Sequence, residues 1–235
     1  MISVCIATYN GEKYIKEQIT SILSQLDNKD EIIVSDDGST DNTINIIKSL
    51  HKNNIHIIYN NHEHGYTPNF ENAIYHAQGE YIFLSDQDDI WEKNKVITCM
   101  RYLKNYDFVV SDAKIINSNG KIIKESFCNE RKSKFGLINN LIRFSFLGCC
   151  IAFKRTILKK ALPFPHNHKL CTHDNWLTLV SLMYYKGAFI NEALIKYRRH
   201  QDNTSSGGFK NSTSLFFKIK YRLYLCLKLI MIFFR

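Results

Sequence analysis

The sequence predicts an α/β fold in which a mostly parallel sheet carries helices on both faces. Short apolar runs alternate with segments of helical periodicity over about the first 110 residues, as a parallel sheet with crossover helices requires. Hydrophobic residues make up 45% of the 235 residues and charged residues 23%, which excludes intrinsic disorder and collagen-like structure. With only 3 prolines and 10 glycines, the chain is expected to form one domain without long linkers.

Each element of the first half is predicted from its own pattern. Ile15, Ile19 and Ile22 recur at helical spacing. Pro68 suits the first turn of a later helix, which Gly79 would end. The apolar runs between the helical segments are typical of buried strands. The expected strands are residues 2–9, 31–36, 56–59, 81–84 and 108–110. The expected helices are residues 12–26, 41–50, 68–77 and 91–103.

The second half is less regular. Asn119-Gly120 lies between apolar stretches and predicts a β-hairpin over residues 114–124. Further strands are expected at residues 148–153 and 188–197, and a helix at residues 173–185. We expect a single domain over residues 1–208, with halves of about 1–112 and 113–208, and a basic amphipathic tail over residues 209–235.

The charge of the chain is concentrated in that tail. The net charge is +9, and residues 212–235 contain five basic residues and no acidic one. A basic, apolar tail indicates contact with an anionic membrane surface, and it carries no motif for reading a nucleic-acid groove. Within residues 215–235 the longest uncharged run, residues 229–234, is too short to span a bilayer. Two structures stay open, an interfacial helix and a helix packed on the domain.

The cysteines indicate a reducing compartment. There are 7, an odd number, with no C-x-x-C pair and no Cys/His set at metal-ligand spacing. The first residues lack the basic and long apolar segments of a secretory signal. We therefore expect a cytoplasmic protein whose thiols are reduced.

Acidic residues follow two of the predicted strands. Asp36 and Asp37 come directly after the second strand, and Asp86, Asp88 and Asp89 after the fourth. The carboxyl ends of parallel strands share one edge of a sheet, where ligands bind. Close carboxylates repel one another, so a divalent cation, Mg²⁺ or Mn²⁺, holding a diphosphate is expected there. Neither G-x-G-x-x-G nor G-x-x-x-x-G-K-[ST] occurs, which excludes dinucleotide oxidoreductases and P-loop NTPases.

Five short motifs in register carry a family resemblance over roughly residues 2–204. They resemble the family 2 glycosyltransferases, and in detail the bacterial rhamnosyl- and hexosyltransferases of surface-polysaccharide assembly. The motifs are Ala7-Thr8-Tyr9-Asn10-Gly11, Asp36-Asp37-Gly38-Ser39-Thr40-Asp41, Ser85-Asp86-Gln87-Asp88-Asp89-Ile90-Trp91, His173-Asp174-Asn175-Trp176 and Tyr197-Arg198-Arg199-His200.

The resemblance implies a GT-A fold and an inverting, metal-dependent sugar transfer. The donor would be a nucleotide-diphosphate sugar, a UDP-hexose or dTDP-rhamnose. The acceptor would be a glycan or lipid-linked oligosaccharide of O-antigen (lipopolysaccharide) or capsule synthesis. Residues 1–112 would bind the nucleotide and residues 113–208 the acceptor. The enzyme would work at the inner face of the cytoplasmic membrane, with peripheral contact through its tail.

The resemblance also implies roles on the donor side. Asp36 and Asp37 would contact the base and ribose, and Asp86 the ribose or donor sugar. Turn chemistry is the alternative for the first acidic motif. The remaining donor-side positions would line the pocket, with an ordinary turn as the alternative for the first motif. They are Ala7, Thr8, Tyr9, Asn10, Glu12 and Gln87.

On the metal and acceptor sides, the resemblance implies that Asp88 ligates the metal, joined by His200. Asp174 would be the catalytic base that takes a proton from the acceptor hydroxyl. Gly148, His173 and Trp176 would lie near the acceptor. The alternatives are a helix cap for Asp174, a core position for Trp176 and a solvated loop for His200.

Two other function classes are alternatives, a non-catalytic scaffold and a phosphohydrolase. A membrane-associated scaffold that binds a nucleotide sugar without turnover is the main alternative, but the acids at Asp88 and Asp174 argue against it. A phosphohydrolase with an Asp nucleophile after its first strand is disfavoured because that strand ends Ala7-Thr8-Tyr9-Asn10. Nucleic acid is not an expected partner.

Overall fold

The structure is a computed structural model that describes residues 1–61, 63–201, 203 and 214–233. Within them the strands form one nine-stranded sheet of order β3-β2-β1-β4-β8-β6-β9-β5, with β7 paired to β6. The strands are β1 (Ile2–Thr8), β2 (Glu31–Asp36), β3 (Ile55–Tyr59), β4 (Tyr81–Ser85), β5 (Ile90–Trp91), β6 (Phe108–Asn117), β7 (Ile122–Lys124), β8 (Ile151–Lys154) and β9 (Gly187–Arg199).

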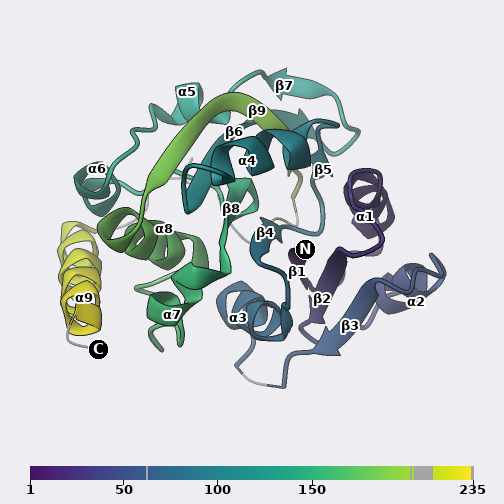
Figure 1. The fold of residues 1–235 in the computed structure, drawn as a ribbon, viewed down its shortest axis with the longest axis horizontal. Helices are drawn as coiled ribbons and strands as arrows, with labels where there is room; N and C mark the ends of the chain where they lie inside the picture. Colours follow the sequence, from purple (N-terminus) through teal and green to yellow (C-terminus); the bar gives the residue numbers. More distant parts are fainter. Residues whose placement is uncertain (62, 202, 204–213, 234–235) are drawn as a thin grey trace.

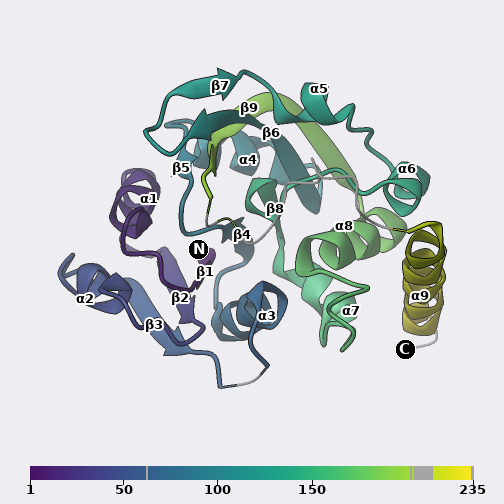
Figure 2. The ribbon, with the colours of Figure 1, turned by 180° about the vertical axis from the view of Figure 1, so that it is seen from behind.

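Helices lie on both faces of the sheet (Figures 1 and 2). The α-helices are α1 (Ile15–Leu23), α2 (Thr43–Lys48), α3 (Tyr66–His76), α4 (Lys95–Leu103), α5 (Phe127–Arg131), α6 (Leu137–Ile142), α7 (Leu158–Ala161), α8 (His173–Tyr184) and α9 (Leu215–Phe233). Two 3₁₀ turns are η1 (Gly148–Cys150) and η2 (Arg155–Ile157). The predicted α/β architecture is therefore confirmed.

The strands of the first half form the parallel part of the sheet. β1 pairs in parallel with both β2 and β4, and β2 pairs in parallel with β3. β8 is antiparallel to β4 and β6, whereas β6 and β9 are parallel. Because β1 is flanked by β2 and β4, the segments that follow these three strands emerge side by side. The sheet thus delivers both acidic motifs to one edge.

Hydrophobic periodicity explains the helices that were predicted. Ile15, Ile19 and Ile22 of α1 are fully buried, as their spacing requires. Pro68 lies in the first turn of α3, where its missing N–H costs no hydrogen bond. The predicted hairpin is also present, with Ile116 of β6 opposite Ile122 of β7.

Two predictions need correction, and three short helices were not predicted. The helix expected from Trp91 begins at Lys95, because Ile90 and Trp91 pair with β9 as the short strand β5. The strand expected from Gly148 begins at Ile151, after the 3₁₀ turn η1. The helices α5, α6 and α7 were not predicted, because each has at most six residues and too few apolar positions to show a period.

The carboxyl-terminal helix α9 packs on the domain through one side. Leu225, Leu229 and Ile232 are buried, and the Tyr184 hydroxyl of α8 donates a 2.7 Å hydrogen bond to the carbonyl of Leu229. None of the helices in the described part of the chain is long and apolar enough to cross a bilayer. The inner side of α9 therefore matches the packed alternative, while its other side stays exposed.

Leu229→Ala should lower the free energy of unfolding by about 2–5 kcal/mol, because it leaves a cavity between α9 and the domain. Leu229 is 3% exposed, whereas Leu227 in the same helix is 61% exposed. Leu227→Ala is the matched control and should change the stability by less than about 0.5 kcal/mol. Denaturant unfolding followed by circular dichroism measures both, and equal effects would contradict the packing of α9.

Candidate active site at the carboxyl edge of the sheet

Thr8, the last residue of β1, joins the two acidic loops. Its carbonyl accepts the backbone N–H of Asp37 at 2.9 Å. Its hydroxyl donates to Oε1 of Gln87 at 2.6 Å. Acids that are some fifty residues apart in the sequence thus lie on either side of one strand end. The predicted meeting of the two loops at one edge is confirmed.

Asp36 and Asp37 do different work in the first loop. Asp36 accepts the backbone N–H of Ser39 at 2.9 Å and its hydroxyl at 2.5 Å, so it closes its own turn. Asp37 accepts Nδ2 of Asn60 at 2.7 Å and the N–H of Gly65 at 2.8 Å. Asp37 therefore faces the neighbouring loop after β3, and Asp36 shapes the backbone that presents it.

Gln87 fastens the second acidic loop to the end of β1. Its Oε1 accepts the N–H of Tyr9 at 2.9 Å, and its Nε2 donates to the carbonyl of Tyr9 at 3.0 Å. A Cβ at Gly11 would lie 2.4 Å from Oε1 of Gln87, so a larger residue there would displace the Gln87 amide from Tyr9. Gln87 therefore holds the pocket wall in place, while the Tyr9 ring is 55% exposed and free of the core.

The other donor-side positions brace the loop after β2. Oδ1 of Asn10 accepts the N–H of Thr40 at 2.8 Å. Oε2 of Glu12 accepts the N–H of Asn42 at 2.9 Å. Ala7 is half-buried, next to the strand end. Asn10 and Glu12 thus support the pocket through the backbone of its neighbouring loop.

The carboxylates after β4 repel one another. Burial, followed by the charges of Asp88 and Asp174, raises the pKa of Asp86 to about 7. Burial, followed by the charges of Asp88 and Asp86, raises the pKa of Asp89 well above its usual range. The influence of Asp174 on Asp86 also places the first turn of α8 against this loop. Such a cluster favours the binding of a cation.

The two residues expected at the metal are in direct contact. Nε2 of His200, just after β9, lies 2.8 Å from Oδ2 of Asp88. Nδ2 of Asn203 donates to the same oxygen at 2.9 Å. The His200 ring also lies beside Tyr14, with centroids 5.0 Å apart. Asn203 was not anticipated, because no motif marks it in the sequence.

Arg198 stabilises the backbone of the acidic loop at Asp88. Its side chain is buried, and its Nε donates to the carbonyl of Asp88 at 2.7 Å. Another nitrogen of the same guanidinium forms a 2.7 Å ion pair with Glu17, and the guanidinium carbon lies 4.6 Å from the Tyr14 ring centroid. Arg198 therefore fixes the backbone of the acidic loop rather than facing the cleft.

Two sets of donor atoms are candidates for a metal. Ligand atoms of Asp86, Asp89 and Cys149 lie within 4.8 Å of one another. Asp89 is fully buried, and the hydrogen bond with the next cysteine, burial and the charge of Asp89 together raise the pKa of the Cys149 thiol well above its usual range. Mg²⁺ and Mn²⁺ also prefer oxygen donors to sulfur, which makes this thiol a poor ligand for them. The oxygen and imidazole donors of Asp88 and His200, with Asp86 nearby, fit Mg²⁺ or Mn²⁺ better.

Asp174 stands at the start of α8 and is half-buried. Its Oδ1 accepts the Thr172 hydroxyl at 2.5 Å and the N–H of Asn175 at 2.8 Å. Both bonds end on one oxygen and so fix the orientation of the carboxylate. A fixed carboxylate beside Asp86 is well placed to take a proton.

The three acceptor-side residues differ in their accessibility. A Cβ at Gly148 would lie 2.6 Å from Nε2 of His173, so Gly148 lets α8 approach closely. His173 is 4% exposed and stacks on Phe70, and burial lowers its pKa. Trp176 is 2% exposed, and its indole N–H donates to the carbonyl of Ala161 at 2.7 Å. This corrects the expectation for Trp176, which is a core residue with no face to offer a sugar.

Tyr66 was missed by the sequence reasoning. It begins α3, is 42% exposed, and lies edge-on to His173 at 5.8 Å. Burial and the charges of Asp174 and Asp86 raise its pKa to about 12, so the hydroxyl stays protonated. Tyr66 therefore lies near both carboxylates, with a hydroxyl that can donate a hydrogen bond. A tyrosine at a helix start has no pattern that would single it out.

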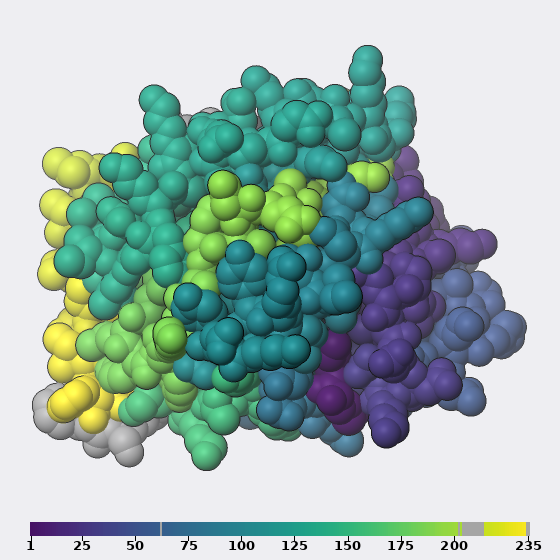
Figure 3. All heavy atoms as spheres, turned by 45° about the horizontal axis from the view of Figure 1, so that its top comes forward, coloured from purple at the N-terminus to yellow at the C-terminus, as the bar shows by residue number. Residues whose placement is uncertain are grey.

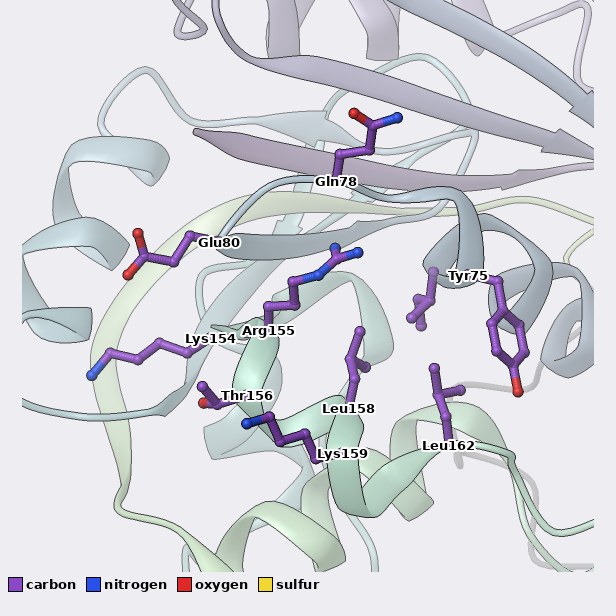
Figure 4. A pocket seen from close by; sticks show the side chains of 10 residues that line it. Tyr75, Gln78, Glu80, Lys154, Arg155, Thr156, Leu158, Lys159 and Leu162 are labelled. Carbon is purple, nitrogen blue, oxygen red and sulfur yellow. The ribbon is translucent and has the colours of Figure 1, made fainter.

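A cavity of about 550 Å³ lies elsewhere (Figure 4). Glu80 and Gln78 on its wall precede β4, whereas the acidic loop follows β4, so the cavity is at the opposite edge of the sheet. Lys154, one of its cations, is paired with Asp107 at 3.0 Å. Its wall has a single carboxylate and none of the acidic motifs, so we do not assign the chemistry to it.

Comparisons with known proteins identify the family of the chain. Residues 3–162 match Glycosyl transferase family 2. The chain is 31% identical over 215 residues to the Escherichia coli UDP-Glc:alpha-D-GlcNAc-diphosphoundecaprenol beta-1,3-glucosyltransferase WfgD, covering 89% of this chain and 81% of that protein. It is 30% identical over 236 residues to the dTDP-rhamnosyl transferase RfbG of Shigella flexneri, covering 92% of this chain and 77% of that protein.

Solved structures share the fold. TarS of S. aureus, residues 1–349 in complex with UDP-GlcNAc, superposes with a TM-score of 0.74 at 20% identity, covering 97% of this chain and 66% of that one. The mannosyltransferase PcManGT of Pyrobaculum calidifontis, in complex with GDP-Man and Mn²⁺, superposes with a TM-score of 0.65 at 16% identity, covering 98% of this chain and 73% of that one.

Asp88→Asn should weaken Mn²⁺ binding by more than about tenfold, because it removes a charged oxygen donor beside His200. Free Mn²⁺, measured by electron paramagnetic resonance in the presence of UDP, reports the affinity. Asp27→Asn, at an exposed loop position, is the matched control and should bind as the unaltered chain does. An unchanged affinity in Asp88→Asn, with a loss in Cys149→Ala, would move the metal to the Asp86–Asp89–Cys149 group.

Proposed function

Because the chain belongs to glycosyl transferase family 2, we propose that it transfers a sugar, with inversion, from a nucleotide-diphosphate donor to a glycan hydroxyl. The observation that carries this proposal is the meeting of Asp37, Asp86, Asp88 and Asp174 around one strand end. Such an edge can hold the base, the diphosphate and the acceptor in a row.

The donor is a UDP-hexose or dTDP-rhamnose. Uracil and thymine both carry an N–H at position 3, which a carboxylate such as Asp37 can accept. Oδ1 of Asp37 accepts Nδ2 of Asn60 and lies 3.4 Å from Nδ1 of His64, whereas Oδ2 accepts the N–H of Gly65. We therefore assign Oδ2, which has a second lone pair, to the base N–H. The exposed ring of Tyr9 is available to stack on the base. The names of two relatives, one a UDP-Glc and one a dTDP-rhamnosyl transferase, support this class of donor.

Asp88 and His200 hold a divalent cation, Mg²⁺ or Mn²⁺, with Asp86 beside them on the donor-sugar side. The cation, when bound, offsets the negative charge of the donor diphosphate. Arg198 and Gln87 keep the loop around it rigid, because they bind the backbone on either side of the site. Preorganisation of this kind lowers the reorganisation needed when charge develops on the leaving group.

Asp174 is the catalytic base. The acceptor hydroxyl oxygen attacks the anomeric carbon in line, and its proton passes to the carboxylate of Asp174. The bond between that carbon and the diphosphate oxygen breaks, and the nucleoside diphosphate leaves. The charge of Asp174 contributes to the raised pKa of Asp86, so the two carboxylates are neighbours and the donor sugar would lie beside both. Tyr66 can donate a hydrogen bond to a sugar hydroxyl there.

The acceptor is a glycan carried on a lipid, in the synthesis of a bacterial surface polysaccharide such as O-antigen or capsule. The E. coli relative named for a diphosphoundecaprenol-linked sugar supports a lipid-linked acceptor. Such an acceptor places the protein at the cytoplasmic face of the membrane, in peripheral contact with it.

Asp174→Asn should lower sugar transfer at least about 10²-fold and leave donor binding unchanged. Asparagine keeps an oxygen that can accept the bonds from Thr172 and Asn175 but cannot take the acceptor proton. UDP-hexoses and dTDP-rhamnose, assayed for nucleoside-diphosphate release with and without Mn²⁺, identify the donor and give the rate. Asp27→Asn should retain full activity. Full activity in Asp174→Asn would refute the role of Asp174 as the catalytic base.

Asp37→Ala should weaken UDP binding by about 10–100-fold, the range expected for losing a hydrogen bond to a charged group. The unaltered protein should prefer UDP to CDP, because cytosine has no N–H at position 3. The variant should lose that preference, whereas Asp27→Ala should keep it. Calorimetric titration with both nucleotides measures the ratio, and an unchanged ratio in Asp37→Ala would remove Asp37 from base recognition.

A further inference from the structure

Helix α9 exposes an apolar face to solvent. Its side chains Phe216, Ile219, Leu223, Leu227, Ile230 and Met231, here called the α9 outer face, are 48–76% exposed. Successive helical residues advance by about 100°, so these six lie within roughly a third of the circumference. Figure 3 shows α9, in yellow, along one edge of the molecule. A contiguous apolar surface of this size marks an interaction site.

The opposite side of α9 fixes how this face is presented. Leu225, Leu229 and Ile232 are buried against the domain, so the outer face points away from it. The Arg222 guanidinium donates to the carbonyls of Leu141 and Ile142 in α6, which joins the two helices. On α6, Ile138 and Ile142 are 71% and 58% exposed. The apolar surface therefore continues from α9 onto α6.

The charges around this face are of one sign. Lys220 is exposed on α9 within the angular range of the outer face, and no acidic residue follows Asp202 in the sequence. An anionic lipid headgroup layer would complement this lysine while its acyl region accepts the apolar side chains. A second copy of α9 would bring only further cations to the contact and no acid to pair with them. Charge complementarity therefore favours lipid over self-association.

We propose that the α9 outer face, together with Ile138 and Ile142 of α6, docks this protein on an anionic phospholipid bilayer. The surface itself is inferred from α9 and α6, and only the reason for docking, access to a lipid-linked acceptor, rests on the proposed function. Helix α8 connects the two sites, because Tyr184 near its carboxyl end bonds to α9 and Asp174 lies in its first turn. Docking through α9 would thus hold Asp174 at a fixed position relative to the lipid surface.

Vesicle co-sedimentation of the full chain tests the proposal. The unaltered protein should bind phosphatidylglycerol-containing vesicles at least tenfold more strongly than pure phosphatidylcholine vesicles. The triple variant Ile219→Ser, Leu223→Ser, Leu227→Ser should lose at least tenfold in binding. Ile97→Ser is the matched control, since Ile97 is 73% exposed on α4 and lies outside this face. Lys220→Glu should reduce the preference for anionic lipid, whereas Lys48→Glu, an exposed position on α2, should keep it.

The outcomes separate docking from catalysis. Loss of vesicle binding in the triple variant, with an unchanged circular dichroism spectrum and unchanged donor hydrolysis in solution, supports the docking surface. Failure of the unaltered chain to bind anionic vesicles, or binding by the triple variant equal to that of Ile97→Ser, overturns it. A concentration-dependent dimer that the triple variant abolishes would assign the face to a second copy and also overturn the proposal. Absent donor hydrolysis with intact vesicle binding would refute the proposed function alone.

Discussion

The site depends on one constraint, the assembly of like-charged carboxylates around the end of β1. Thr8 bonds to the loop after β2 through its carbonyl and to the loop after β4 through its hydroxyl, so neither acidic loop can move away from the other. Burial and the charges of Asp88 and Asp174 raise the pKa of Asp86 to about 7, so the fully charged cluster is unfavourable by itself. The proposed cation fits this edge because it would relieve the repulsion between the carboxylates. The donor diphosphate fits because its negative charge would be attracted to the bound cation.

The second half of the chain supplies what the parallel strands cannot. β9 pairs along β6 and brings Arg198 beneath the acidic loop and His200 against Asp88. Helix α8 places Asp174 beside Asp86, and Gly148 permits the close approach because a Cβ there would strike His173. The first and second halves of the chain are therefore joined through contacts with the same few carboxylates. The exposed side of α9 extends this arrangement towards a membrane surface in our proposal.

Regular patterns in the sequence were enough to predict the parallel half of the sheet. Short apolar runs predicted β1 to β4, and helical spacing together with Pro68 and Gly79 predicted α1 to α3. The GT-A fold implied by the motifs is confirmed by the superposition on TarS. The strand ends located Asp37 and Asp88 correctly, because a parallel sheet brings its carboxyl ends together. Tertiary contacts decided the rest. Ile90 and Trp91 form a strand only because β9 passes beside them, and the support that Gln87 gives to Tyr9 leaves no periodic trace. Trp176 was misassigned because a motif does not reveal burial.

Anomalous diffraction from a crystal of the protein with Mn²⁺ and UDP tests the central claim most directly. We predict a single manganese peak within ligand distance of Asp88 and His200 and next to the diphosphate. We also predict that the uracil ring lies against Asp37. A manganese peak at Asp89 and Cys149, or a nucleotide bound in the cavity at the opposite edge of the sheet, would contradict the account.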